Sequence, residues 1–325
     1  MERFLITKEE TQKLKGIFAI LIILHHCIQF TNLYYPFSLG HLFVGIFFFL
    51  SGYGLQVSYD LKNDYLKGFF RKRVAKVYVE FIYVTAIYII FRSIMGIRYS
   101  VTNIFKSLYG GFTIVNFSWY IMVIIVFYSF FYISHKIAKK NSNMTLLLFI
   151  ISYIGICYIA KLELWWYISV GAFWVGCIWK KILIFMNCLV FKHKNSLFLL
   201  TITVFTMSYL KIISKLIATL NIHQDKILKL VEFTELFVSS ILFCIIVIII
   251  KSLNKSKSVS LFSKVGDISG ELYLMQGIPI ILFATCSIKN NFVLYTLSVL
   301  IVTLALSILL KSIMYAHEKV FKAIK

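Results

Sequence analysis

Charge, and acidic charge above all, is scarce in this sequence. Asp and Glu number 13 against 34 Lys and Arg, and charged residues of both signs make up only 14% of the chain. Proline occurs twice in 325 residues. A soluble domain typically carries about a quarter charged residues. These shortages exclude an ordinary soluble protein.

The sequence also lacks any paired arrangement of its cysteines. The six are scattered singly, mostly inside apolar runs, and no CxxC spacing occurs. They therefore predict neither a disulfide framework nor a metal site, and they do not reveal the redox compartment. They are Cys27, Cys157, Cys177, Cys188, Cys244 and Cys286.

Apolar residues are abundant instead, at 60% of the chain, and the mean hydropathy is +0.86. Repeated apolar runs approach the ~20 residues that cross a bilayer as a helix. They predict an all-α, polytopic integral membrane bundle of about ten transmembrane helices, forming a single domain over residues 1–325 with no separate soluble domain. Residues 98–117 are expected to be a loop or a shallow re-entrant piece. The expected spans are residues 16–33, 38–57, 77–97, 118–135, 144–161, 166–182, 195–213, 234–251, 266–287 and 291–311.

The formal net charge of +21 is concentrated in the short segments between these runs. Most Lys and Arg fall in connections on one side, which predicts that both termini are cytoplasmic. An even number of spans agrees with that orientation. The basic charge is thus explained by topology and by anionic lipid head groups, and no nucleic acid partner is predicted.

Two adjacent histidines, His25 and His26, lie deep in the first apolar run. Histidine takes and returns a proton at neutral pH, and an ionisable group at membrane depth is a functional candidate because it is costly to bury. His26 lies ten residues, or ~15 Å, beyond Gly16 on a helix, near or just past the bilayer midplane. Both are catalytic candidates, since spacing alone does not select one. The alternatives are hydrogen bonds to neighbouring helices or a metal pair with His41.

A basic cluster containing Arg71, Arg73 and Lys76 precedes the third span, at its cytoplasmic end. It is either an anchor of the positive-inside kind or a binding site for a phosphate-bearing donor. The second interpretation is favoured by the alternation of cations with aromatic residues and by the planar arginine fork, which matches phosphate oxygens. These three residues are the candidate donor site.

Other features are less informative. The segment Ser51 to Gly54 interrupts the second span, and its glycines more often serve close backbone packing than ligand binding. The remaining histidines, His135 among them, are expected to be solvated at span ends or in connections. Further charges within spans are Glu80, Arg92 and Glu271.

Together these residues resemble the membrane acyltransferase-3 family over nearly the whole chain. Three positions depart from its pattern: Gln276 stands where many members have histidine, Lys76 where arginine is usual, and Val79 where proline is common. The matching segments are Lys15 to His26, Phe47 to Tyr53 (FFFLSGY), Arg73 to Lys76 (RVAK), Ser118 to Tyr120 (SWY), Gly171 to Gly176, and Asp267 to Leu274 (DISGELYL).

The resemblance implies a multi-pass O-acyltransferase of the cell membrane, most simply an O-acetyltransferase. Acetyl-CoA would be the cytoplasmic co-substrate, and a hydroxyl of a cell-surface or exported carbohydrate the acceptor. His26 matches the family's catalytic histidine, acting as base or acyl carrier. A separate extracytoplasmic transferase is a possible partner, no metal is predicted, and composition suggests a bacterium. The alternative is a transporter or flippase without acyl chemistry, although no internal repeat supports it.

Overall fold

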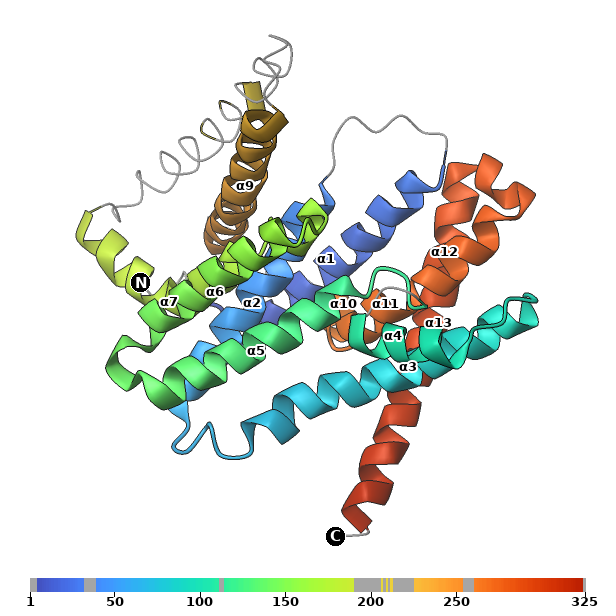
Figure 1. The fold of residues 1–325 in the computed structure, drawn as a ribbon, viewed down its shortest axis with the longest axis horizontal. Coiled ribbons are helices and arrows are strands. Elements are labelled where there is room, and N and C mark those ends of the chain that lie inside the picture. The colour runs from blue at the N-terminus through green and yellow to red at the C-terminus, as the bar shows by residue number, and fades with distance from the viewer. Residues whose placement is uncertain are drawn as a thin grey trace. The chain divides into compact units, whose positions relative to one another are not determined.

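The structure is a computed structural model (Figure 1). Its described part is helical, without any β-strand, and this confirms the all-α class. The residues described are 5–31, 39–110, 114–189, 225–253 and 260–323, with positions 206, 209, 211 and 212.

Contacts divide the chain into two compact units, which are described separately. The single domain expected over residues 1–325 stays a prediction. Unit 1 comprises Met1–Thr11, Leu39–Leu66 and Ile133–Ser258, and unit 2 comprises Gln12–Ser38, Lys67–Tyr132 and Val259–Lys325.

Among the described residues, eight helices are long and apolar enough to cross a membrane. The expected span at 195–213 lies almost wholly outside the described residues. The expected span at 266–287 is instead two short helices, α11 (Ser269–Met275) and α12 (Gly277–Ala284). The eight candidate spans are Lys8–Gln29, Gly40–Leu61, Phe70–Ile94, Trp119–Ile137, Lys139–Ile159, Leu164–Ile184, Lys229–Ile250 and Phe292–Val320.

Unit 1 is held together by close packing of α2 and α7. Gly52 on α2 lies against the backbone carbonyl of Phe173, and Gly176 on α7 lies against that of Phe49, so neither site has room for a Cβ. Glycine permits such approach between membrane helices. The helix is continuous through Ser51 to Gly54, so the expected interruption is wrong and the packing role is confirmed at Gly52. The elements of unit 1 are α2 (Gly40–Leu61), η3 (Lys139–Asn141), α6 (Ser142–Ile159), η4 (Leu164–Trp166), α7 (Gly171–Leu189) and α9 (Asp225–Leu253).

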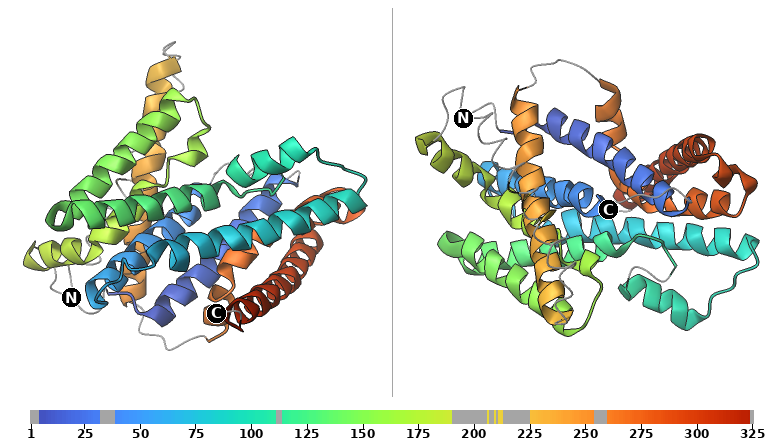
Figure 2. Two further views of the ribbon diagram at one scale, coloured as in Figure 1. Left: turned by 60° about the horizontal axis from the view of Figure 1, so that its bottom comes forward. Right: turned by 90° about the horizontal axis from the view of Figure 1, so that it is seen from above.

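Unit 2 contains most of α1 and α5 and the whole C-terminal part of the chain. In it α13 packs on α3, α11 and α12, and the long C-terminal helix can be followed beside the shorter pair in Figure 2. Its elements are α1 (Lys8–Gln29), η2 (Phe70–Ala75), α3 (Lys76–Ile94), α4 (Val101–Gly110), α5 (Trp119–Ile137), α10 (Ser260–Gly266), α11, α12, η5 (Ser287–Asn290) and α13 (Phe292–Ala323).

The start of α1 packs against α10 through two glycines. Gly16 lies against the backbone of Phe262, and Gly266 lies against the backbone carbonyl of Gln12. This close contact joins the part of α1 that belongs to unit 2 to α10. Gly16, which stands ten residues before His26, is therefore a packing residue.

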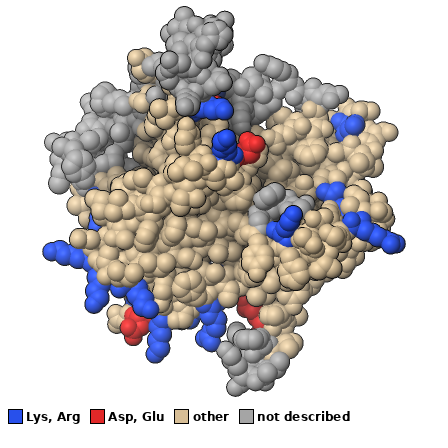
Figure 3. Space-filling model, viewed as in Figure 1, with Lys and Arg blue, Asp and Glu red and all other residues tan. Residues whose placement is uncertain are grey.

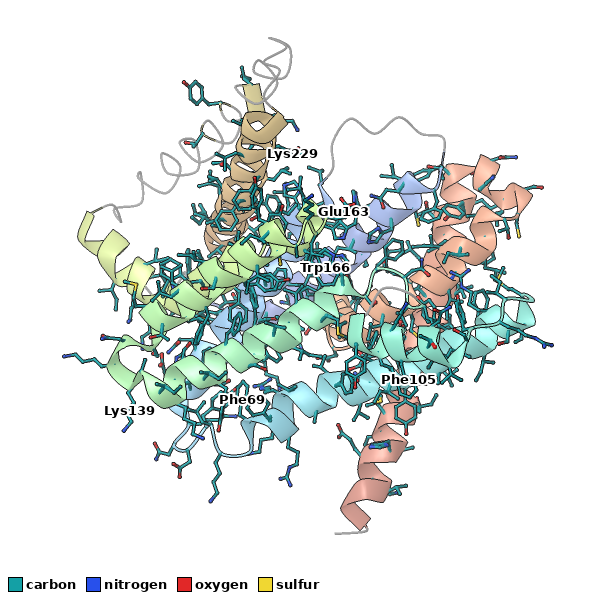
Figure 4. The ribbon with its side chains drawn as sticks, viewed as in Figure 1. Phe69, Phe105, Lys139, Glu163, Trp166 and Lys229 are labelled. Atoms are coloured by element: carbon teal, nitrogen blue, oxygen red, sulfur yellow. The ribbon has the colours of Figure 1, made fainter. Side chains whose placement is uncertain are left out.

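The segment 98–117 is not simply a loop, because it contains α4. Val101, Phe105 and Tyr109 are 69%, 58% and 82% exposed, and their spacing of four places them on one face of the helix. Phe105 is labelled in Figure 4. Such a one-sided apolar face is typical of a helix that lies in a membrane interface.

The outer surfaces of the long helices are apolar. On α13, Ile301 and Ile308 are 67% and 53% exposed. On the face drawn in Figure 3 most of the described surface belongs to residues other than Lys, Arg, Asp and Glu. Exposed aliphatic side chains in spans of this length are what contact with lipid requires.

Candidate active site

Both catalytic candidates lie near the C-terminal end of α1, in unit 2. His25 is buried, with 7% of its surface exposed, whereas His26 is partly exposed. Their ring centroids are 5.5 Å apart. Gln29, one turn further along α1, contacts both: His26 Nδ1 lies 3.0 Å from Gln29 Oε1, and Gln29 Nε2 lies 3.3 Å from His25 Nε2. Residues three and four apart on a helix meet in this way.

With the Gln29 amide in the orientation that the structure gives it, these contacts fit one arrangement of the protons on the two neutral imidazoles. The amide oxygen of Gln29 only accepts, so the Nδ1 of His26 carries the proton and donates it, leaving a lone pair on Nε2. The amide nitrogen of Gln29 only donates, so the Nε2 of His25 accepts. His26 therefore has the unprotonated nitrogen that a general base needs, whereas the Nε2 of His25 is already engaged.

Phe117, in the connection before α5, covers the His26 ring. The two rings are stacked, with centroids 3.8 Å apart and planes inclined by 19°. Phe117 has a φ of 64°, in the left-handed region that a bulky residue rarely adopts. The Tyr273 hydroxyl donates to the Phe117 carbonyl, and Ser118 Oγ donates to the Val115 carbonyl at 2.8 Å. These hydrogen bonds thus keep Phe117 in an unfavourable backbone conformation, in which its ring lies against the His26 imidazole.

Polar side chains of α3 and α11 surround this connection. A nitrogen of the Arg92 guanidinium donates to Asn116 Oδ1 at 3.1 Å, and Tyr88 OH donates to the Leu274 carbonyl at 3.0 Å. Gly277 has no room for a Cβ between the Tyr88 hydroxyl and the Asn116 side chain. The connection before α5 is therefore fixed to α3 and to the junction of α11 and α12.

Gln276, at that junction, is fully buried. Its Nε2 donates to the Tyr273 carbonyl at 2.9 Å, while its Oε1 has no hydrogen-bond partner among the described residues. Buried polar atoms are normally paired. The amide oxygen of Gln276 is thus a buried acceptor without a partner among the described residues.

The basic cluster lies at the opposite end of α3 from Arg92. Arg71 and Arg73 belong to η2, a π-helical turn that leads directly into α3, and such turns occur frequently at functional sites. Lys76 forms an ion pair with Glu318 of α13 at 2.8 Å. Lys15 of α1 lies within electrostatic reach of Arg73, so cations from two helices share this end of unit 2.

The structure brings the predicted residues together as two groups. The histidine pair forms one, and Arg71, Arg73 and Lys76 form the other. His26 follows Lys15 by eleven residues, which separates the base from the cationic end by ~16 Å along α1.

His135 is not solvated as expected, whereas His193 and His223 lie outside the described residues. His135 is 2% exposed, its Nε2 lies 3.2 Å from Gln56 Oε1, and its ring meets that of Tyr59 at 4.6 Å between centroids. All three belong to unit 1. The position of His135 at a span end suggested solvent, but packing against α2 buries it.

Sequence reasoning missed Gln29, Asn116 and Phe117 as parts of the site. The signal for Gln29 was present, since it stands three and four residues after the histidines on one helix. No local signal marked Phe117, because its role depends on a contact between segments about ninety residues apart. Only the fold brings them together.

Fold and sequence together define a class: a helical membrane protein with a histidine pair on α1 and a group of basic residues at the start of α3. A family model described as an acyltransferase domain, Acyl_transf_3, matches residues 13–312. The chain belongs to this acyltransferase family, which confirms the resemblance seen in its motifs. Comparison with curated proteins and with solved structures gave no significant match.

Proposed function

We propose that this acyltransferase is an O-acetyltransferase of the bacterial cell membrane. It transfers the acetyl group of cytoplasmic acetyl-CoA to a hydroxyl of a cell-surface or exported carbohydrate. The observation that carries this proposal is the contact of His26 with Gln29, because it leaves the Nε2 of a partly exposed imidazole free to accept a proton. His25 contributes by accepting a hydrogen bond from the Gln29 amide that contacts His26.

The cationic end of unit 2 holds the donor. Arg71 and Arg73, on the π-helical turn, together with Lys76, provide positive charge for the phosphates of coenzyme A. Arginine binds phosphate oxygens through two parallel N–H donors. The pantetheine arm then runs the ~16 Å toward His26 that the helix rise requires. In this arrangement the phosphates and the thioester of one donor molecule bind at different depths of unit 2.

The reaction follows from the protonation state of His26. Its Nε2 takes the proton of the acceptor hydroxyl as the hydroxyl oxygen attacks the thioester carbonyl. The carbon–sulfur bond breaks, and the imidazolium returns the proton to the departing thiolate. The products are an acetyl ester and coenzyme A, and His26 ends as it began. Gln29 keeps the Nδ1 proton in place and so orients Nε2 throughout.

A covalent route uses the same residues. The lone pair of His26 Nε2 attacks the thioester first, and the carbon–sulfur bond breaks to release the coenzyme A thiolate. The acceptor hydroxyl then attacks the acetylated imidazole, which leaves as the neutral ring, and the hydroxyl proton neutralises the thiolate. Rapid quench with a neutral denaturant, which spares an acetylated imidazole, separates the routes when enzyme is mixed with labelled acetyl-CoA without acceptor. Label retained on the protein in wild type and absent in His26→Gln identifies the covalent route. Transfer without protein-bound label identifies direct attack.

The proposed function is tested with purified protein in lipid nanodiscs, supplied with labelled acetyl-CoA and a crude surface-glycan extract. We expect label in the glycan and a rise in melting temperature on adding coenzyme A, since a ligand that binds only the folded state stabilises it. Arg71→Gln with Arg73→Gln should remove that rise. Lys139→Gln with Lys140→Gln, which alters an exposed basic turn of unit 1, should retain it.

If acetyl-CoA neither donates label nor stabilises the protein, the proposal is overturned. Transport of a glycan then becomes the function to test. If purified protein binds the donor yet labels only in the presence of membrane extract, a separate extracytoplasmic transferase completes the reaction. The two results are distinguished by the donor-dependent melting temperature alone.

A further inference from the structure

Arg92 is placed on the same side of unit 2 as the histidines. It follows Lys76 by sixteen residues, or ~24 Å along α3, and therefore lies far from the cationic donor end. Its guanidinium donates to Asn116, and the next residue, Phe117, stacks on His26. Arg92 thus reaches the connection that carries the ring covering the base.

The charge of Arg92 is not neutralised within the described part of the chain. No carboxylate there lies within 4.0 Å of its guanidinium, and its buried Nε has no hydrogen-bond acceptor. The contact with Asn116 is to a neutral amide. A guanidinium has five N–H donors and no acceptor. Cations within membrane segments are costly and normally pair with an anion.

Anchoring to lipid head groups is the obvious competing role for an arginine near the end of a span. An anchoring side chain extends toward water at the interface. Arg92 instead turns onto Asn116, and the solvent-accessible area of its Nε is below 1 Å². Its direction fits a ligand site beside the base better than an anchor.

We propose that Arg92, held by Asn116, binds an anionic group of the acceptor next to the hydroxyl that His26 deprotonates. The inference rests on the proposed function and specifies its acceptor as an acidic saccharide or a phosphodiester-linked polymer. Carboxylate and phosphate share the planar recognition that arginine provides.

Three probes test the site: an oligogalacturonate, its carboxyl-reduced form and an oligomer of glycerol phosphate. Binding is followed as a rise in melting temperature without any acetyl-CoA, and transfer is followed with labelled donor. Wild type should bind at least one anionic probe more tightly than the reduced one by about tenfold, corresponding to one extra charge-assisted contact. The probe that shows the difference identifies carboxylate or phosphate as the ligand.

Arg92→Gln should raise the KM for the anionic probe by about tenfold, to the value of the reduced probe, with kcat little changed, because the lost contact is a binding one. Arg92→Lys, which keeps the charge but loses the fork, should fall between the two. Arg98→Gln, at an exposed position after α3, is the matched control and should leave both values unaltered. Coenzyme A should stabilise all of these variants equally.

Equal effects of Arg92→Gln on the anionic and the reduced probe would overturn the proposal, as would no effect on either. So would a preference for anionic probes that appears only in nanodiscs containing anionic lipid, which would assign Arg92 to head groups. Absence of acetyl transfer in wild type would instead contradict the proposed function, while the donor-free binding measurement still decides the Arg92 site.

Discussion

The imidazole of His26 lies flat against the ring of Phe117, with centroids 3.8 Å apart. One face of the base is thereby covered by a residue whose own backbone has a positive φ. An aromatic contact of this kind is worth ~1 kcal/mol beyond the area it buries. Its larger consequence is positional, since Phe117 fixes the plane in which Nε2 can meet a substrate.

Removing the Phe117 ring should slow transfer more than it destabilises the fold. In Phe117→Gly the positive φ is relieved while the stack on His26 is lost. We expect kcat to fall by roughly tenfold to a hundredfold through misplacement of the base. Phe117→Tyr retains the stack and should stay within about threefold of wild type by the same argument. Steady-state kinetics and melting temperatures of both variants test this prediction. Equal losses of activity in Phe117→Gly and Phe117→Tyr would contradict a positioning role.

Gln29 should control which nitrogen of His26 carries the proton. In Gln29→Leu the acceptor for Nδ1–H is lost, so the imidazole samples both tautomers and only one is a base at Nε2. We expect a fall in kcat of about tenfold, below the 10²–10⁴ that a general base contributes. Ring ¹⁵N chemical shifts of selectively labelled histidine report the tautomer directly. Unchanged shifts in Gln29→Leu would show that Gln29 does not set it.

The helical class and eight of the ten spans followed from apolar runs alone, because length and hydropathy decide whether a segment crosses a bilayer. Position within a helix also marked His26 as a catalytic candidate, and that role stays a prediction. The expected span at 266–287 is less regular, since it divides at Gln276, where the side chain is buried and turned onto the Tyr273 carbonyl. Periodicity does not encode that division.

Other features depended on contacts that no local pattern contains. The packing of Gly52 against α7, the burial of His135 against α2 and the stack of Phe117 on His26 all join distant segments. The sequence also did not predict α4, because this helix is short and its apolar residues form no run long enough to suggest a span. Residue type indicated where chemistry is possible, whereas tertiary structure indicated which side chains orient it.

The glycines of α2 should differ sharply in their tolerance of a methyl group. At Gly52 a Cβ meets the Phe173 carbonyl, whereas at Gly54 nothing lies within 4 Å. Gly52→Ala should reduce the free energy of unfolding by roughly 1–3 kcal/mol through overpacking. Gly54→Ala should be neutral or stabilising by up to about 1 kcal/mol, because alanine favours helix. Unfolding of both variants in detergent tests this, and equal effects would contradict the packing described.

Glu318 should compete with the donor for Lys76. The pair they form is surface-exposed, at 58% and 43% for the two side chains, so breaking it should change stability by less than about 1 kcal/mol. Glu318→Gln removes this ion pair, while Glu80 and Glu271 remain within electrostatic reach of Lys76. It should tighten coenzyme A binding about threefold, an increment typical of one screened charge. Lys76→Gln should weaken it. Isothermal titration measures both; weaker binding in Glu318→Gln would exclude Lys76 from the donor site.

The most direct measurement compares wild type, His26→Gln and His25→Gln for transfer of labelled acetyl from acetyl-CoA to glycan, with coenzyme A stabilisation recorded for each. We predict that His26→Gln loses 10²–10⁴ in rate, roughly the contribution of a general base, and still gains stability from coenzyme A. His25→Gln should lose far less. Wild-type rates in His26→Gln would contradict the central claim that this imidazole carries the chemistry.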